Sequence, residues 1–168
     1  MLLAFLIVAI FVSTMLLVAY KDATSMTIPN WISLVLLAGF FLITPFVWQG
    51  LEVFGTHLLV GFTFFAAGFA MFAFGWLGGG DAKLMAATGI WWLWDDAFLY
   101  VSYTTIAGGI LALFLLLGRK YIPVRVLTSR FAQQMFKDEK KMPYGIALAA
   151  GALLTLPQSA IFKAALGL

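Results

Sequence analysis

The sequence predicts an all-α membrane protein, a polytopic bundle of about six transmembrane helices that forms a single domain over residues 1–168. Two observations predict this fold class. Hydrophobic residues make up 64% of the chain and charged residues only 10%, which leaves more apolar surface than a soluble fold can bury. The apolar residues also fall into long runs, and a bilayer offers the backbone polar groups of such runs no partners except those within a helix.

Charged and turn-forming residues divide the chain into six hydrophobic segments. They cover residues 2–20, 31–48, 58–77, 83–94, 97–117 and 144–166. Segment 83–94 is shorter than the roughly 20 residues that a spanning helix needs, so whether it crosses the bilayer fully is left open. The first segment lacks the basic start and the small-residue cleavage site of a signal peptide, and we expect it to remain as a helix.

The distribution of Lys and Arg predicts the orientation in the membrane. If six helices alternate in direction, Lys21, Lys83 and the basic loop 118–142 fall on one face, and only Lys163 lies near the other. Short cytoplasmic loops are enriched in Lys and Arg. We therefore expect the basic face to be cytoplasmic and both termini to lie outside.

Loop 118–142 has the pattern of an amphipathic helix lying on the cytoplasmic surface. Pro123 can open a helix, and the apolar residues that follow recur at three- or four-residue spacing while the basic residues fall between them. Such a helix is expected to lie on anionic membrane lipids. A role in docking a substrate is the alternative.

Few side chains are available for chemistry. The chain has no cysteine, which excludes disulfides, thiol nucleophiles and cysteine-based zinc sites. His57 is the only histidine, and we expect a surface position for it at a helix end. The run Trp91 to Trp94 has the composition of an interfacial aromatic belt, with Asp95 and Asp96 as a polar turn after it. We expect no metal, no cofactor and no nucleic-acid partner.

Asp22 and Asp81 stand out among the acids because of what surrounds them. Asp22 precedes Ile28-Pro29-Asn30, where the proline forces a turn and Asn30 can cap the next helix. Asp81 ends the run Gly78-Gly79-Gly80-Asp81 at the mouth of a helix, and glycines let a second backbone approach closely. Taken separately, Asp22 also fits a hydrated acid at a helix end, and Asp81 also fits a helix cap after a flexible loop.

The two acids fall on the same predicted face, which favours aspartyl chemistry. In that chemistry one carboxylate deprotonates a water molecule while a protonated partner polarises the scissile carbonyl. Two like charges held close together share a proton near neutral pH. The alternative is a non-catalytic transporter or pilus-assembly scaffold whose acids bind a cation or a partner.

At these residues the sequence resembles the prepilin peptidases, the type IV leader peptidases of the Gly-x-Gly-Asp aspartic membrane protease group. Three elements match in order: Asp22 with Ile28-Pro29-Asn30, then Gly78-Gly79-Gly80-Asp81, then Met142-Pro143-Tyr144-Gly145-Ile146-Ala147. The resemblance implies a single peptidase domain that cuts the leader from a prepilin or pseudopilin at the cytoplasmic face of the bacterial inner membrane. It implies that Asp22 and Asp81 are catalytic.

The resemblance also suggests which residues contact the substrate and which branch of the family is involved. Gly78 and Gly80 would leave room for the scissile segment, and Pro143 and Tyr144 would help to shape its pocket. Larger members carry a cysteine-containing insertion between the first helices, whereas here residues 21–30 make that connection. The chain is similar to the compact peptidase-only type of Flp pilus and tight-adherence systems. The particular prepilin and the oligomeric state are left open.

Overall fold

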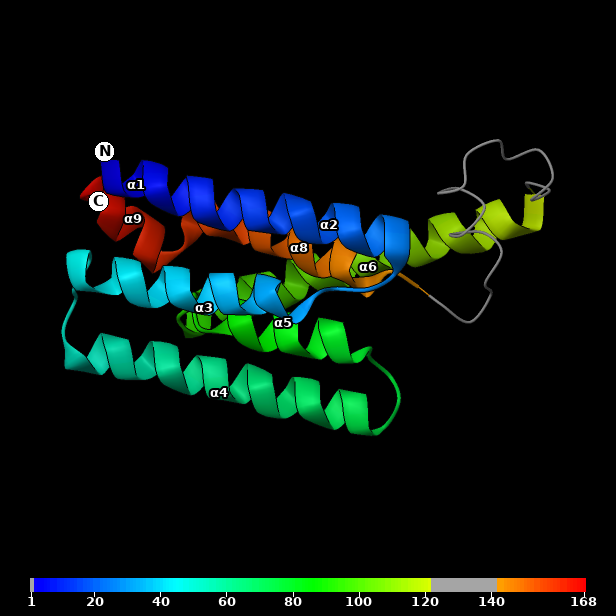
Figure 1. The fold of residues 1–168 in the computed structure, drawn as a ribbon, viewed down its shortest axis with the longest axis horizontal. Coiled ribbons are helices and arrows are strands. Elements are labelled where there is room, and N and C mark those ends of the chain that lie inside the picture. Colours follow the sequence, from blue (N-terminus) through cyan, green and yellow to red (C-terminus); the bar gives the residue numbers. More distant parts are fainter. Residues whose placement is uncertain (1, 122–141) are drawn as a thin grey trace.

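The computed structural model describes residues 2–121 and 142–168, and over these residues the chain is helical with no strand. Figure 1 shows the helices packed side by side along one direction. In chain order the elements are α1 (Leu2–Ile7), the π-helical turn η1 (Val8–Val12), α2 (Ser13–Ser25), α3 (Asn30–Ile43), the 3-10 turn η2 (Thr44–Phe46), α4 (Leu51–Ala73), α5 (Gly79–Gly89), α6 (Trp94–Tyr121), α8 (Tyr144–Thr155), the 3-10 turn η4 (Leu156–Gln158) and α9 (Ala160–Leu166).

The all-helical, polytopic bundle is confirmed, and fewer than six of the described helices qualify as spans by length and composition alone. Within residues 2–121 and 142–168, three helices are long and apolar enough to cross a membrane: Phe5–Ser25, Leu51–Ala73 and Trp94–Tyr121. The pair Tyr144–Gln158 and Ala160–Leu166, bent by 44°, makes a fourth if it is one span. Helix α5 has 11 residues. The amphipathic helix predicted in loop 118–142 follows α6 in the sequence and lies outside the described residues.

Two helix boundaries near the acids differ from the prediction. Helix α2 continues past Asp22 to Ser25, and Met26 is its C-cap with a left-handed backbone (φ 50°). The Met26 N–H donates a hydrogen bond to the Asp22 carbonyl oxygen. Helix α5 begins at Gly79 rather than at Lys83, because Gly78 takes the extended conformation of an N-cap. Asp22 and Asp81 therefore both lie in terminal turns of helices.

The expected cap of α3 is also wrong. Pro29 occupies the N-cap position, and Asn30 is already the first helical residue. The Asn30 side chain instead accepts a hydrogen bond from the Lys83 ammonium at 2.9 Å. This bond ties the start of α3 to α5.

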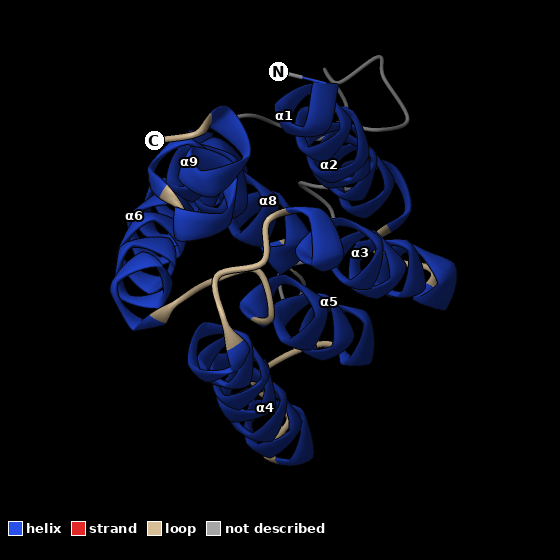
Figure 2. Ribbon diagram, turned by 90° about the vertical axis from the view of Figure 1, so that its left-hand side faces the viewer, coloured by secondary structure: helices blue, strands red, loops and turns tan. Residues whose placement is uncertain are grey.

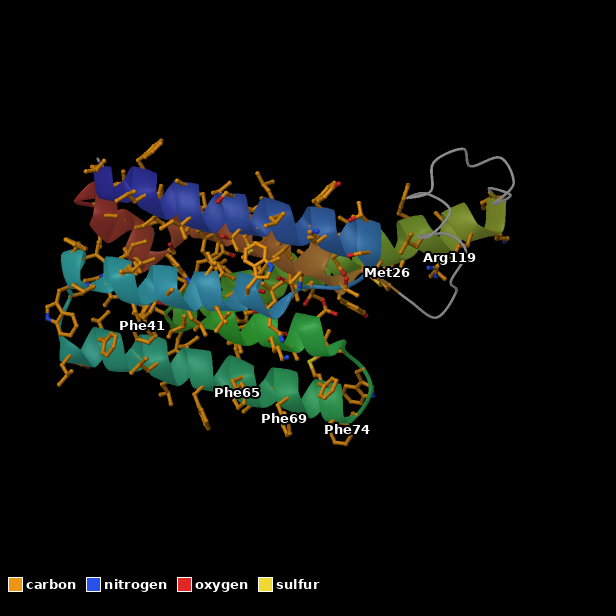
Figure 3. The ribbon with its side chains drawn as sticks, viewed as in Figure 1. Met26, Phe41, Phe65, Phe69, Phe74 and Arg119 are labelled. Carbon is orange, nitrogen blue, oxygen red and sulfur yellow. The ribbon has the colours of Figure 1, made fainter. Side chains whose placement is uncertain are left out.

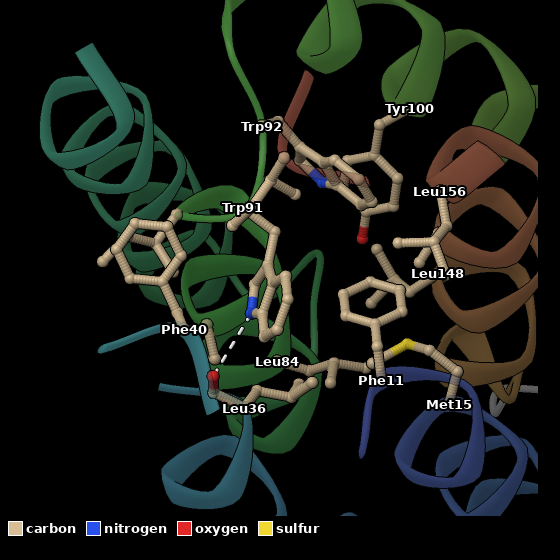
Figure 4. Packing of buried hydrophobic residues seen from close by; sticks show 14 of the residues in the cluster. Phe11, Met15, Leu36, Phe40, Leu84, Trp91, Trp92, Tyr100, Leu148 and Leu156 are labelled. Carbon is tan, nitrogen blue, oxygen red and sulfur yellow. Dashed lines mark hydrogen bonds between the residues drawn. The ribbon is translucent and has the colours of Figure 1, made fainter. Parts of the chain in front are cut away.

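The core contains several buried aromatic residues, and two of them are tryptophans assigned to an interfacial belt. Trp91 and Trp92 are fully buried and contact the ring of Phe11 edge-on at centroid distances of 4.9 and 5.5 Å. The Trp91 indole N–H donates to the Leu36 carbonyl oxygen (Figure 4). Only Trp94 of the run is exposed, so most of the run fixes the end of α5 in the core.

Two buried polar residues, His57 and Asp96, connect helices near the end of the bundle that holds both termini (Figure 1). His57 is buried, not at the surface as predicted, and its Nδ1 lies 3.0 Å from the Ile90 carbonyl oxygen. Asp96 is also buried, and its Oδ2 accepts hydrogen bonds from the backbone N–H of Leu93 and of Ala160. Asp96 thereby joins the start of α6 to the start of α9.

Glycines let the helices that carry the site approach closely. A Cβ atom at Gly68 in α4 would lie 3.1 Å from the Ala82 carbonyl oxygen in α5, and one at Gly61 would lie 3.1 Å from the Cβ of Ile90. Figure 2 shows α5 between α3 and α4. The short helix that carries Asp81 is thus held between two longer ones.

Candidate active site

Asp22 projects from the last turn of α2 against the start of α8. Its side chain is 4% exposed, and its Oδ2 accepts a hydrogen bond from the Ile146 backbone N–H at 3.3 Å. A Cβ atom at Gly145 would lie 2.8 Å from the same oxygen, so the absence of a side chain there lets α8 reach the carboxylate.

Asp81 lies in the first turn of α5, directly after the three glycines. Gly80 is packed against the turn that follows Asp22, because a Cβ atom there would lie 3.1 Å from the Ile28 Cβ and 3.2 Å from the Ile28 carbonyl oxygen. A side chain at this position would push against Ile28, so glycine favours the contact. The contact explains why two motifs far apart in the sequence meet in the fold.

The two acids line one cavity of about 310 Å³, which we call the acid cleft. Its lining consists of Asp22, Met26, Thr27, Ile28, Gly78, Gly79, Gly80 and Asp81. The end of α2 and the start of α5, which carry the two acids, lie away from the end of the bundle that holds the termini (Figure 1). Four of the six residues predicted for the site are thus brought together: Asp22, Asp81, Gly78 and Gly80.

The Asp81 carboxyl group has the environment of a proton donor. Its Oδ1 is buried and has no hydrogen-bond partner among the described residues. Burial, and secondly the nearby charge of Asp22, raise the pKa of Asp81 to about 7, against the opposing effect of the Gly78 backbone N–H. Asp81 therefore holds a proton at pH values where an ordinary aspartate is ionised.

The structure does not bring Pro143 and Tyr144 into the acid cleft. Pro143 is buried at the N-cap of α8. Tyr144 is exposed and lines a different cavity of about 380 Å³ together with Met71 and Tyr100. A role for these two residues in binding substrate stays a prediction.

The third motif contacts the site through Gly145 and Ile146, which the sequence analysis quoted but did not single out. A glycine in the first turn of a helix that begins after a proline was the available signal. The contact of this motif with Asp22 could not be predicted from a local signal, because 124 positions separate Asp22 from Ile146. Among the described residues no group of three or more His, Cys, Asp or Glu side chains is arranged to hold a metal ion.

Comparison with known proteins gives one family. The model of the type IV leader peptidase family matches residues 9–113, which is more than half of the chain. This stretch contains both acids and the three glycines and ends before the third motif. The comparisons with curated proteins and with solved structures gave no significant match.

Proposed function

The chain belongs to the type IV leader peptidase family, and on this basis we propose that it is an aspartic endopeptidase that cleaves the leader from Flp-type prepilins. Cleavage takes place at the cytoplasmic face of the bacterial inner membrane, and the whole chain acts as one peptidase domain. The observation that carries the proposal is the meeting of Asp22 and Asp81 in one cleft with Gly78 to Gly80. The short connection over residues 21–30 and the absence of cysteine from the sequence fit the compact type.

Asp22 is the general base in this proposal. Its Oδ2 accepts a hydrogen bond from the Ile146 N–H at the start of α8, and such a hydrogen bond stabilises a carboxylate. The ionised Asp22 removes a proton from a water molecule, whose oxygen then attacks the scissile carbonyl carbon. The bond between the water oxygen and the carbonyl carbon forms while the carbonyl double bond becomes a single bond.

Asp81 is the general acid. Its Oδ1 has no partner within the described residues and, when protonated, the carboxyl group can donate to the carbonyl oxygen of the substrate. Collapse of the tetrahedral intermediate breaks the C–N bond, and the leaving amine takes the proton that Asp22 had accepted. Asp81 regains its proton from the intermediate, so both acids return to their starting states.

The glycines give the substrate backbone access to these groups. A peptide must lie extended at the scissile bond so that the water and the two carboxyl groups can reach its carbonyl. A side chain at Gly78 would come within 2.8 Å of the Asp81 Oδ2, which would displace the acid. The glycines therefore serve the cleft by lacking side chains.

Cleavage by the purified protein is the direct test. The protein is reconstituted into liposomes with a Flp-type precursor, and mass spectrometry identifies the new N-terminus of the product. We expect one cut between the basic leader and the apolar helix, and the same cut with Asp95→Asn, whose side chain is exposed at the far end of the bundle. An intact precursor under conditions in which the protein stays folded would contradict the proposed function.

A further inference from the structure

A groove open to the membrane lies beside the acid cleft, between α3 and α4 and over α5. Its larger part is a cavity of about 510 Å³ with Leu37 of α3 and Phe62 of α4 in its walls and Ala86 of α5 in its lining. Figure 2 shows α3 and α4 on either side of the short helix α5. We call this surface the α3–α4 groove.

The α3–α4 groove adjoins the acid cleft. A second cavity of about 290 Å³ shares Phe65 and Lys83 with the first cavity and Gly79 with the acid cleft. Figure 3 shows that α4 runs towards the end of the bundle where Met26 lies, with Phe65 and Phe69 along it and Phe74 at its C-cap. A molecule lying in the groove therefore has one end beside Asp81.

The length of the groove suits a helix. Along α4 its lining runs from Leu58 to Phe72, about 21 Å at 1.5 Å per residue. That length accommodates about four turns of an apolar helix. The small side chain of Ala86 in the lining permits the close approach by which membrane helices pack.

Polar side chains distinguish this groove from a surface that only lipid covers. Ser33 lines the groove and is 7% exposed, and its buried Oγ has no hydrogen-bond partner in the part of the chain that the structure describes. The bonded pair Asn30 and Lys83 lines it as well. An unpartnered buried hydroxyl costs free energy. An acyl chain offers it no partner, whereas a peptide backbone does.

We propose that the α3–α4 groove binds the apolar helix of the membrane-anchored precursor, with the segment just after the scissile bond lying at Ser33, Asn30 and Lys83. This inference rests on the proposed function. An extended segment has backbone N–H and C=O groups free of helical bonds, and the Ser33 hydroxyl and the Lys83 ammonium can bond to them. The helix then positions the scissile carbonyl over Gly79 and Asp81.

Cysteine crosslinking tests the location, because the chain contains no cysteine of its own. Leu37→Cys and Phe62→Cys are made singly in the Asp81→Asn background, which keeps the precursor uncut, and each is combined with a precursor carrying one cysteine in its apolar helix. The control is Ile110→Cys in α6, which is 65% exposed and does not line the groove. We expect disulfides from the two groove positions and not from the control.

The outcomes separate the groove from the catalytic proposal. Equal crosslinking at Ile110→Cys, or none at either groove position although the unsubstituted protein cuts the same precursor, would overturn the groove and leave the peptidase. Failure of the unsubstituted protein to cut the precursor would instead count against the proposed function.

A second variant tests the role of the Ser33 hydroxyl. Ser33→Ala removes a buried hydroxyl that has no partner among residues 2–121 and 142–168, so the fold should keep or gain thermal stability. The lost bond to substrate should raise KM about 2- to 12-fold, the equivalent of about 0.5–1.5 kcal/mol for a hydrogen bond. Ser102→Ala in α6, a half-buried residue that does not line the groove and whose hydroxyl donates to the Phe98 carbonyl oxygen, should leave KM unchanged. An unchanged KM for Ser33→Ala would refute the contact.

Discussion

The contact between Gly145 and Asp22 makes a quantitative prediction for Gly145→Ala. The new Cβ atom would lie 2.7 Å from the Ile28 Cδ1, 2.8 Å from the Asp22 Oδ2 and 2.9 Å from the Asp22 Cγ. The end of the Ile28 side chain can move aside, but the carboxyl group has to swing away from α8. We therefore expect the hydrogen bond from the Ile146 N–H to Asp22 to be lost.

The size of the effect follows from the kind of bond that is lost. A hydrogen bond to a charged group contributes about 1.5–3 kcal/mol, and each 1.36 kcal/mol corresponds to a factor of ten in rate. If the bond holds Asp22 in its reactive position, kcat should fall about 10- to 150-fold. Initial rates of precursor cleavage in proteoliposomes measure this.

Gly55→Ala is the matched control, because Gly55 lies within α4 and a Cβ atom there would meet nothing within 4 Å. Alanine in place of a helical glycine should leave kcat unchanged and stabilise the helix by up to about 1 kcal/mol. A Gly145→Ala variant that cleaves within twofold of the unsubstituted rate would refute the reasoning. Equal losses in both variants would refute it as well.

Three further predictions concern the chemistry, the packing and the orientation. The mechanism needs a protonated Asp81, whose pKa is raised to about 7. We therefore expect kcat/KM to fall as the pH rises through about 7. A pH profile that is flat across this range would contradict the assignment of Asp81 as the acid. In Gly151→Ala the new Cβ atom would lie 2.8 Å from the Thr104 backbone N, so thermal unfolding should show a loss of about 1–3 kcal/mol, whereas Gly109→Ala, with open space around it, should show none. Lys120→Cys should react with a membrane-impermeant thiol reagent only from the cytoplasmic side and Leu168→Cys only from the outside, and the reverse pattern would overturn the proposed side of cleavage.

Much of the fold could be predicted because hydrophobic runs and turn residues mark membrane helices directly. The segment around Trp91 could not be, since tryptophan suits both an interface and a core, and only the packing against Phe11 decides between them. The burial of His57 depends in the same way on a distant carbonyl, that of Ile90.

The candidate site was predictable to the extent that its residues carry local signals. Asp22 and Asp81 were recognisable from the proline turn and the glycines beside them. Their common cleft depends on Gly80 packing against Ile28, which is a contact between distant parts of the chain. The placement of Gly145 against Asp22 is of the same kind, and sequence spacing carries no information on it.

The paired action of Asp22 and Asp81 is tested most directly by cleavage rates of Asp22→Asn, Asp81→Asn and the double variant, beside the control Asp95→Asn. Asparagine keeps the size and hydrogen bonding of aspartate but cannot cycle a proton. Each single change should therefore lower kcat by about 10²- to 10⁴-fold, while Asp95→Asn should keep the normal rate.

Because both acids act on one water and one carbonyl, the double variant should be scarcely slower than either single one. Thermal unfolding of each variant confirms that the bundle is intact. If Asp22→Asn or Asp81→Asn, folded in the membrane, still cuts the precursor at close to the unsubstituted rate, the two carboxyl groups are not a catalytic pair.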